Sequence, residues 1–406
     1  MMRSLFAAVS GLRNHQVRMD VIGNNIANVN TAGFKSGRVT FQELFSQTVR
    51  GAAAPRDDRG GTNPQQVGLG SALASIDNIH TQGSLQVTGQ ETDLGLQGAG
   101  FFILSFGETE AYTRVGTFDV DADGYLVDPA SGLRVNGWTA EQGEFQARDA
   151  QSLEEIRIPL GQEISATATS RVSLAGNLDA GVAEGHVEAT AVEVFDSLGR
   201  RHLVEIVFDK TGDNQWSWTA EGPEGIQGTG TVGFTTEGLY DGDEEDQHTI
   251  TLDLQDAEDL EIGLDFTGLS QMAGDFSATV IHRNGYTRGS LEDFTIDSSG
   301  VITGLYTNGI TRPLGQIAVA SFPNPGGLIK SGENLYLESN NSGLVSIGEA
   351  GTGNRGDIMP GTLEMSNVDL AREFTDMIIT QRGFQANSRL ITVTDEMLNE
   401  LVNMKR

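Results

Sequence analysis

The 406-residue sequence contains no cysteine and comparatively few basic residues. Without cysteine the chain can form no disulfide, no thiolate zinc site and no cysteine nucleophile. Its 26 lysines and arginines are outnumbered by 56 aspartates and glutamates, which leaves a net charge of -30. A strongly acidic chain is repelled by a phosphate backbone and by an anionic bilayer surface. The composition therefore predicts that the chain does not bind nucleic acid.

Long apolar runs are missing as well. No run approaches the roughly 20 residues that span a bilayer, so we expect no membrane insertion. The first residues, MMRSLFAAVSGLRNHQ, place an arginine before a short apolar patch, as a secretory signal peptide does. Arg13 ends this patch after about nine residues and no small-x-small cleavage site follows, which predicts that no signal peptide is cleaved.

Both ends of the chain carry apolar residues at helical spacing. In the N-terminal segment the series consists of Leu5, Val9, Leu12, Met19, Ile22 and Ile26. This spacing places the apolar side chains on one face of a helix of about 25 residues. In the C-terminal segment a seven-residue repeat consists of Leu370, Met377, Phe384, Ile391 and Leu398. It predicts one continuous, coiled-coil-like helix over 366–404, with Ser366 or Asn367 as its N-cap.

The middle of the chain has a different pattern. Most of the 52 glycines lie there, together with short alternating runs such as HVEATAVEVF and turn signals such as DSLG, DADG and NPGG. Alternating runs between such turns indicate half-buried antiparallel strands. We therefore predict a multidomain α+β fold in which long terminal helices enclose antiparallel β-domains.

A weak internal repeat, which we call the internal echo, suggests the order of these domains. YTRVGTFDVDADGYLV at 112–127 and YTRGSLEDFTIDSSGVIT at 286–303 share their opening residues and a later Asp-x-x-Gly. We interpret the two segments as halves of one β-domain, interrupted by a central β-domain of the barrel or sandwich type. The predicted division is a helical core domain at 1–30 with 366–406, an extended connector at 31–70, a discontinuous β-domain at 71–145 with 285–365, and an inserted β-domain at 146–284.

The terminal helices need packing partners. Fixing about 37 residues of backbone costs on the order of 1 to 2 kcal/mol each, whereas five buried heptad side chains contribute only about 1.5 to 3 kcal/mol each. An isolated helix or a single pair is therefore marginal. The alternative to assembly is an ordinary intramolecular helix pair. We favour other copies of the same chain as the partners, with the interface formed by Leu5, Val9, Leu12, Met19, Ile22, Ile26, Leu370, Met377, Phe384, Ile391 and Leu398.

Each motif that suggests enzyme chemistry lacks the neighbouring residues that this chemistry requires. GTGTVG at 228–233 fits a dinucleotide-binding pattern, but the residues that follow do not predict the helix that this site requires. DVDADG at 119–124 copies half of a calcium loop, yet Ala130 stands where a bidentate glutamate is needed. We predict a hairpin turn there, with weak calcium binding as the alternative. The six histidines show no ligand spacing, so we expect no metal, no cofactor and no catalysis.

The stretch GNNIANVNTAGFKS at 23–36 ends the first helix with four asparagines in seven residues. One interpretation is a solvated helix end, with Asn30 or Gly33 in a left-handed cap. The other is that Asn24, Asn25 and Asn28 bond to the C-terminal helix and to neighbouring copies, because each amide both donates and accepts. Polar contacts of this kind fix register in coiled coils.

Three segments together resemble the bacterial flagellar axial proteins, a family of rod and hook subunits. These segments are NNIANVNTAGFKS at 24–36, LQGAGFFIL at 96–104 with the segment 112–138, and SNVDLAREFTDMIITQRGFQANSRL with the residues that follow it to 406. The family signature maps onto Asn24, Asn25, Asn28, Thr31, Gly33, Phe34 and Lys35. FDSLGRRHLVEIVFDK at 195–210 is similar to the start of the central domain of hook subunits, which the shorter rod proteins lack.

The resemblance implies a structural subunit of the bacterial flagellar hook, outside the cell. Such a subunit leaves through the type III export apparatus without a cleaved signal peptide and is added beneath a hook cap. It polymerises with other hook subunits into a hollow curved tube, a universal joint between the rod and the hook-filament junction proteins. The alternatives are a distal rod or hook-associated axial protein and, from another class, a secreted β-rich adhesin.

Overall fold

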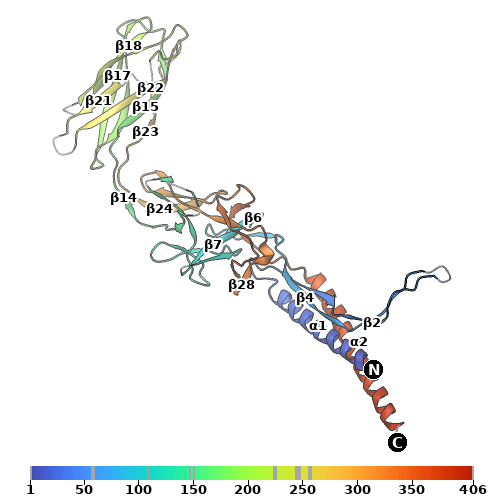
Figure 1. Ribbon diagram of the computed structural model, residues 1–406. Helices are drawn as coiled ribbons and strands as arrows, with labels where there is room; N and C mark the ends of the chain where they lie inside the picture. Colours follow the sequence, from blue (N-terminus) through green and yellow to red (C-terminus); the bar gives the residue numbers. More distant parts are fainter. Residues whose placement is uncertain are drawn as a thin grey trace. The chain divides into compact units, whose positions relative to one another are not determined.

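A computed structural model describes residues 2–55, 60–107, 109–141, 143–145, 148–149, 151–222, 226–242, 248–254 and 258–404 (Figure 1). The chain divides into two compact units, which we treat separately. Unit 1 comprises 1–158, 295–303 and 313–406, and unit 2 comprises 159–294 and 304–312. Long helices at the two termini and strands nearly everywhere between them confirm the predicted fold class.

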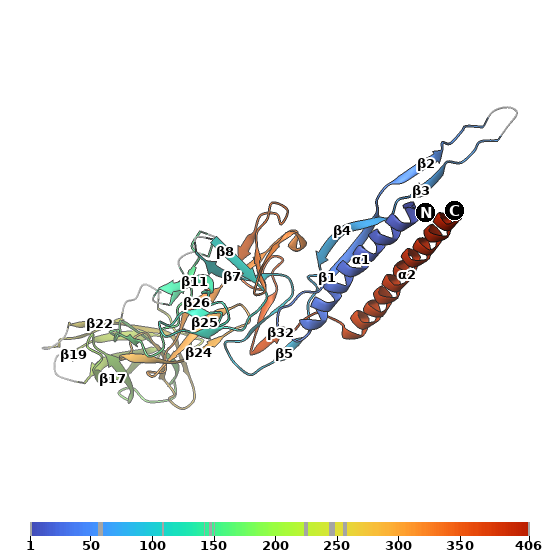
Figure 2. The same cartoon turned by 90° about the horizontal axis from the view of Figure 1, so that it is seen from below.

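The terminal helices of unit 1 lie side by side with the two chain ends at the same end of the pair (Figures 1 and 2). Helix α1 runs over Met2–Ala27 and helix α2 over Leu370–Asn403. The predicted N-cap of α2 was wrong, because Asp369 accepts hydrogen bonds from the backbone N–H groups of Ala371 and Arg372. Asn367 cannot serve as the cap, since its amide bonds to backbone groups of Ser36 and Ile79.

The predicted connector at 31–70 is not without secondary structure. Strand β1 (Gly37–Glu43) pairs with β4 (Ser71–Asn78), and β2 (Ser46–Arg50) pairs with β3 (Gln65–Gly68). Residues 56–59 of the connector lie outside the described part of the chain. The prediction of an extended connector did not include these pairings, because β1 finds its partner beyond the connector. Local periodicity carries no signal for such a distant pairing.

The β-domain of unit 1 is built from strands on both sides of the central insertion. Its six-stranded sheet has the order β28 (Ile329–Gly332), β29 (Leu335–Leu337), β8 (Thr109–Thr113), β7 (Phe101–Phe106), β27 (Val319–Ser321) and β30 (Ser346–Gly348). Two smaller sheets pair β5 (Leu85–Val87) with β32 (Thr362–Glu364) and β6 (Leu94–Gln97) with β31 (Asp357–Pro360). A core around Phe101, Tyr112 and Trp138 lies against the six-stranded sheet.

A further sheet has seven strands and begins close to this core. Its order is β12 (Glu144–Phe145), β11 (Asn136–Glu141), β26 (Thr311–Ile317), β25 (Val301–Tyr306), β24 (Gly289–Ile296) and β14 (Glu163–Ile164), with β13 (Glu154–Glu155) paired to β11. Pairing of β13 with β11 keeps the chain in unit 1 beyond residue 146, where we had predicted the insertion to begin. The boundaries of unit 2 accordingly differ from the predicted 146–284.

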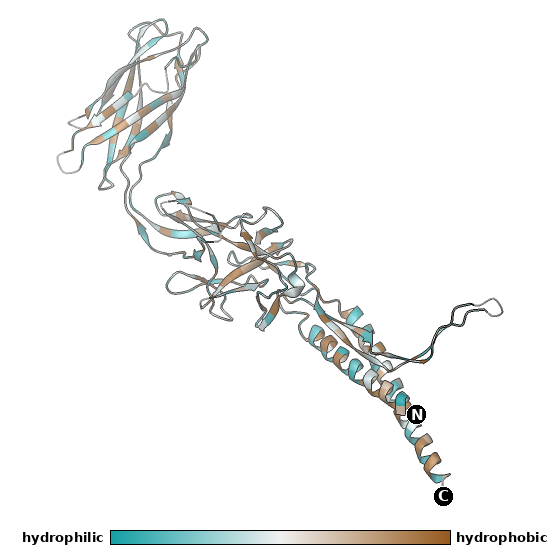
Figure 3. Cartoon of the chain, viewed as in Figure 1, coloured by the Kyte–Doolittle hydropathy of each residue, from teal (hydrophilic) through white to brown (hydrophobic). Residues whose placement is uncertain are grey.

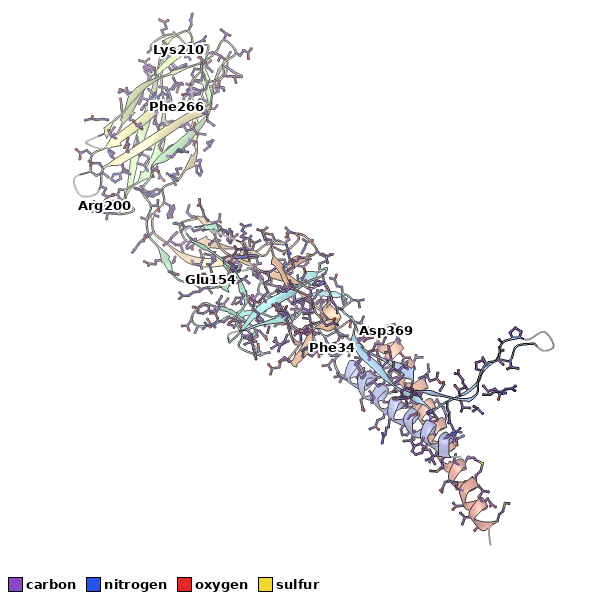
Figure 4. The ribbon with its side chains drawn as sticks, in the orientation of Figure 1. Phe34, Glu154, Arg200, Lys210, Phe266 and Asp369 are labelled. Carbon is purple, nitrogen blue, oxygen red and sulfur yellow. The ribbon has the colours of Figure 1, made fainter. Side chains whose placement is uncertain are left out.

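Unit 2 consists of two sheets around one apolar core. One has the order β16 (Val187–Phe195), β17 (Arg201–Gly212), β18 (Gln215–Glu221) and β20 (Thr229–Gly233). The other has the order β19 (Ile226–Gln227), β21 (His248–Leu252), β22 (Leu260–Met272), β15 (Arg171–Asp179) and β23 (Thr279–Arg283). Trp216 and Trp218 from the first sheet and Phe266 from the second are fully buried between them. Figure 4 labels Phe266 within unit 2. Unlike the predicted antiparallel pairs, β15 and β22 are parallel.

The internal echo marks a shared turn, and the two halves of the β-domain pair through other strands, such as β8 with β29 and β7 with β27. Asp121, Asp196 and Asp297 each open a four-residue turn in which the carboxylate accepts backbone N–H bonds, at 2.7 to 3.0 Å. The Asp-x-x-Gly glycine has positive φ in all three turns. At DVDADG this turn joins β9 (Asp119–Val120) to β10 (Leu126–Val127), which confirms the hairpin.

Two further sequence motifs have a structural explanation. GTGTVG lies largely in strand β20 and is followed by a turn, so the helix required for a dinucleotide site is missing there. Among the described residues, no group of three or more His, Asp and Glu side chains is arranged to hold a metal ion. No helix in the described ranges has both the length and the apolar character for crossing a membrane.

Candidate assembly surface

The α2 side of the contact between α1 and α2 is polar where a coiled coil would be apolar. The α2 residues along it recur every seven positions and are Glu373, Thr380, Asn387 and Thr394. Thr380 and Thr394 are buried, and their hydroxyls donate to the backbone four residues earlier. On α1, Gly11 lies against Asn387, and His15 lies against Gly383. We call this contact the polar seam.

Ionic and amide groups complete the polar seam. Arg18 of α1 lies 3.0 Å from Asp376 of α2, and both side chains are about one third exposed. A pair at this exposure contributes only about 0 to 1 kcal/mol. Burial raises the pKa of Glu373 and lowers the pKa of His15. The polar seam therefore aligns the helices but supplies little of the apolar burial that would hold an isolated pair together.

Apolar side chains flank the polar seam on both sides of α2. The first series, stripe A, is the predicted repeat of Leu370, Met377, Phe384, Ile391 and Leu398. The second, stripe B, consists of Ile379, Leu390, Val393, Met397 and Leu401, each about half exposed. At 100° per residue the two stripes fall on opposite sides of the polar seam. Figure 3 shows brown, hydrophobic segments along α2 as far as its free end.

The predicted interface residues are unevenly covered within one chain. Ile22 is buried, whereas Leu370 and Phe384 are exposed. The others are half-buried, namely Leu5, Val9, Leu12, Met19, Ile26, Met377, Ile391 and Leu398. Stripe B was absent from the predicted interface because its spacing of 11, 3, 4 and 4 residues breaks the seven-residue repeat. Exposed apolar surface of this extent is typical of protein–protein contact.

The asparagines around the end of α1 separate into two kinds. Asn25 is buried and makes the predicted bond to the C-terminal helix, donating to Glu373 Oε1 at 3.2 Å. It also exchanges two hydrogen bonds of 2.9 Å with the backbone of Gly37. Asn28 is instead bonded locally to Asn24 and Thr31. Of the contacts with α2 predicted for Asn24, Asn25 and Asn28, the hydrogen bonds within one chain form that of Asn25.

We expect Asn25→Ala to destabilise the docking of α1 by about 1 to 3 kcal/mol, because it leaves buried groups of Gly37 and Glu373 without partners. Asn28→Ala is the matched control, with a smaller expected cost, because Asn28 is only partly buried and its side chain bonds to residues near it in the chain. Hydrogen exchange of α1 and α2 in the two variants measures the difference. Equal protection in both would contradict the role given to Asn25.

The rest of the signature forms a buried ionic cluster. Lys35 Nζ lies 2.6 Å from Glu364 Oε1, with both side chains fully buried. Arg114 Nη1 lies 3.2 Å from Glu364 Oε2 and is nearly as buried. Gly33 adopts a φ of +68°, and a Cβ there would meet the backbone of Arg114 and Val115 at less than 3 Å. Phe34 is buried beneath the Lys330 ammonium, 5.2 Å from its ring centroid.

This cluster joins three distant segments of unit 1. Lys35 follows α1, Arg114 follows strand β8, and Glu364 ends strand β32 shortly before α2. Burial lowers the pKa of both Lys35 and Arg114, and the Glu364 carboxylate opposes that effect. The arrangement fixes both helix ends to the β-domain. Glu364 and Arg114 were missing from the predicted site because a charged residue in a sequence gives no sign of its burial.

His80 lies beside this cluster, in contact with the rings of Phe101 and Tyr336. Burial, together with the charges of Lys35, Arg114 and Lys330, lowers its pKa to about 4. In the unfolded chain, with a pKa of about 6.5, His80 binds its proton at a higher pH than in the folded chain. Stability is therefore complete above about pH 6.5 and decreases as the pH falls toward about 4, by up to about 3 kcal/mol.

We expect His80→Phe to remove this contribution. Urea unfolding of unit 1 at about pH 7 and about pH 4.5 should show a smaller acid-induced loss of stability in the variant than in the wild type. The histidine resonance that disappears in the variant should titrate near pH 4 in the wild-type spectrum. An identical loss of stability in both proteins, or titration near pH 6.5, would contradict this account of His80.

Comparison with known proteins gives matches along most of the chain. The family models that match are Flagella basal body rod protein over 5–35, Flagellar hook protein FlgE/F/G D1 domain over 95–179, Flagellar basal body protein FlaE D2 domain over 164–286, and Flagellar basal body rod FlgEFG protein C-terminal over 359–404. Flagellar hook protein FlgE of Borreliella burgdorferi is 46% identical over 442 residues, and the alignment covers 100% of both chains. The chain belongs to the flagellar hook protein FlgE family.

Other members of the FlgE family support the same assignment. FlgE of Treponema pallidum is 43% identical, with 100% of both chains covered. A Helicobacter pylori FlgE2 crystal structure is 16% identical and covers 69% of this chain and 100% of its own, with a TM-score of 0.52, which supports the fold. The chain is a subunit of the bacterial flagellar hook, in a structural family. These matches give no support to the adhesin alternative.

Proposed function

We propose that this FlgE chain polymerises through its terminal helices into a hollow, curved tube that transmits torque as a universal joint. The observation that carries the proposal is the arrangement of α2, with apolar stripes on both sides of a polar seam. Apolar stripes supply adhesion to neighbouring copies, and polar groups such as Asn25 and Glu373 set register. Stripe A and the α1 positions Leu5, Val9, Leu12, Met19 and Ile26 form the intersubunit surface in this proposal. Ile22, which the sequence also assigned to this surface, is buried within the single chain and is left out.

The proposal also states where the subunit acts and which proteins it contacts. The subunit is exported by the flagellar type III apparatus without a cleaved signal peptide and lies outside the cell. It contacts the rod at one end of the hook and the hook-filament junction proteins at the other, and a hook cap guides its addition. The role is structural, so we expect no catalysis, cofactor, nucleic acid or membrane insertion. The proposed domain division is the helical pair, the ribbon of β1 to β4, the discontinuous β-domain and the inserted unit 2.

A deletion strain tests the proposed function. A bacterium without this gene should keep its rods but lack hooks and filaments, and re-expression of the wild-type chain should restore both. Electron microscopy of isolated basal bodies measures the result. Hooks of normal length in the deletion strain would contradict the proposal.

A distal rod subunit is the second candidate. It is favoured by the flagellar basal-body rod protein FlgG of Bacillus subtilis, which is 32% identical, with 100% of both chains covered. The same micrographs separate the candidates, because loss of a distal rod subunit shortens the rod. Complete rods without hooks would support the assignment as a hook subunit.

A further inference from the structure

The hairpin of β2 and β3 presents an apolar face that the described residues of unit 1 leave exposed. Leu69 N–H donates to the Phe45 carbonyl at 2.9 Å, and Gln47 pairs with Val67. Since side chains alternate along a strand and paired residues share a face, Phe45, Val67 and Leu69 lie on one face, together with Gln47. Their exposed fractions are 75%, 44% and 37%, and Val49 beside them is 63% exposed.

The opposite face of the hairpin is polar. Thr48 pairs with Gln66, whose Nε2 donates to the Thr48 hydroxyl at 3.2 Å, and Ser46 pairs with Gly68. The hairpin is thus amphipathic, although both of its faces are exposed in the single chain. An isolated two-stranded hairpin is at best marginally stable in water, so an amphipathic one needs a partner for its apolar face.

Charge indicates what kind of partner fits. The chain has a net charge of -30, yet residues 60–76 contain no ionisable side chain, and Arg50 is the only one within β2 and β3. Self-association of an acidic chain is least opposed where charge is lowest. The base of the hairpin is anchored on α1, because Ser71 N–H donates to the Ser10 hydroxyl at 3.3 Å.

A complementary surface exists on α2. Val393, Met397 and Leu401 of stripe B line a shallow groove of about 590 Å³, edged by Glu396 and Glu400. Three apolar side chains between two carboxylates match an apolar hairpin face that carries a single arginine. The groove lies on the opposite side of the polar seam from stripe A, so its occupation is compatible with the proposed helical interface.

We propose that the β2–β3 hairpin of one subunit docks its apolar face on the stripe B groove of a second copy. Phe45, Val67 and Leu69 cover Val393, Met397 and Leu401, while Arg50 lies near Glu396 and Glu400. The hairpin is then a second assembly surface, separate from stripe A. This inference rests on the proposed function, since both require contact between copies.

Site-specific photo-crosslinking in assembling full-length protein tests the docking directly. A benzophenone side chain at position 45 should link to α2 peptides at 393–401 of another copy, and the same probe at position 48, on the polar face, should not. Mass spectrometry of the linked dimers identifies the peptides. Crosslinks from position 45 to another hairpin, to a different protein, or to none would overturn the proposal.

Variants give an independent measurement. Phe45→Ser with Val67→Ser should raise the protein concentration needed for assembly at least tenfold, whereas Thr48→Ser with Gln66→Ser should leave it unchanged. Arg50→Glu should also weaken assembly, and Glu396→Arg in the same chain should restore it. Circular dichroism controls for folding. Normal assembly of the Phe45 and Val67 variant would overturn hairpin docking and leave the hook function standing, whereas failure of the wild type to assemble would overturn both.

Discussion

Glu364→Gln is expected to destabilise unit 1 by about 3 to 5 kcal/mol, because it leaves two buried cations without a counter-charge. Lys35 and Arg114 both lie within 3.2 Å of this carboxylate. Glutamine has nearly the same size as glutamate. The loss of stability therefore measures the effect of removing the negative charge. Urea-dependent hydrogen exchange of strands β5, β6 and β32 measures the loss locally.

Glu155→Gln is the matched control for this prediction. Glu155 lies 2.6 Å from Arg134 in the same unit, with both side chains more than one third exposed. An exposed pair of this kind contributes about 0 to 1 kcal/mol. Equal costs for the two substitutions would show that the buried cluster does not hold the helix ends to the β-domain.

Placing aspartate in stripe A is expected to abolish polymerisation while leaving the monomer folded. Phe384→Asp, Ile391→Asp and Leu398→Asp each put a carboxylate into the proposed apolar contact between copies. A cost of about 3 kcal/mol at one contact corresponds to a roughly 100-fold weaker association. In the free chain these positions are at least partly exposed, so the β-sheets should remain intact.

Gln385→Asp is the control, because it adds the same charge one residue from Phe384 on an exposed, polar part of α2. Sedimentation and electron microscopy measure polymer, and circular dichroism measures fold. If stripe A variants formed hooks of normal length, the predicted residues would serve only internal packing.

The helices could be predicted from the sequence because their signal is local. Leu370, Met377 and Phe384 repeat within one segment, and the repeat holds wherever the rest of the chain lies. The β1–β4 ribbon could not be found in this way, since Gly37 pairs with Asn78 across an intervening hairpin. The Asp-x-x-Gly echo was recognisable for the same local reason, but it specifies a turn rather than the pairing of distant strands.

The apolar part of the site could be predicted more completely than the polar part. A search for apolar repeats finds stripe A but passes over Thr380 and Thr394, although these polar residues have the same spacing and are more deeply buried. Asn24, Asn25 and Asn28 are chemically equivalent in the sequence. Only the position of Gly37 and Glu373 in the fold distinguishes Asn25 from the other two.

Electron cryomicroscopy of polymer grown from the purified full-length chain tests the central claim most directly. We expect tubes whose channel wall is formed by α1 and α2, with Phe384 and Ile391 of stripe A packed against neighbouring subunits. A polymer in which strands line the channel and both helices face the outer solvent would contradict it.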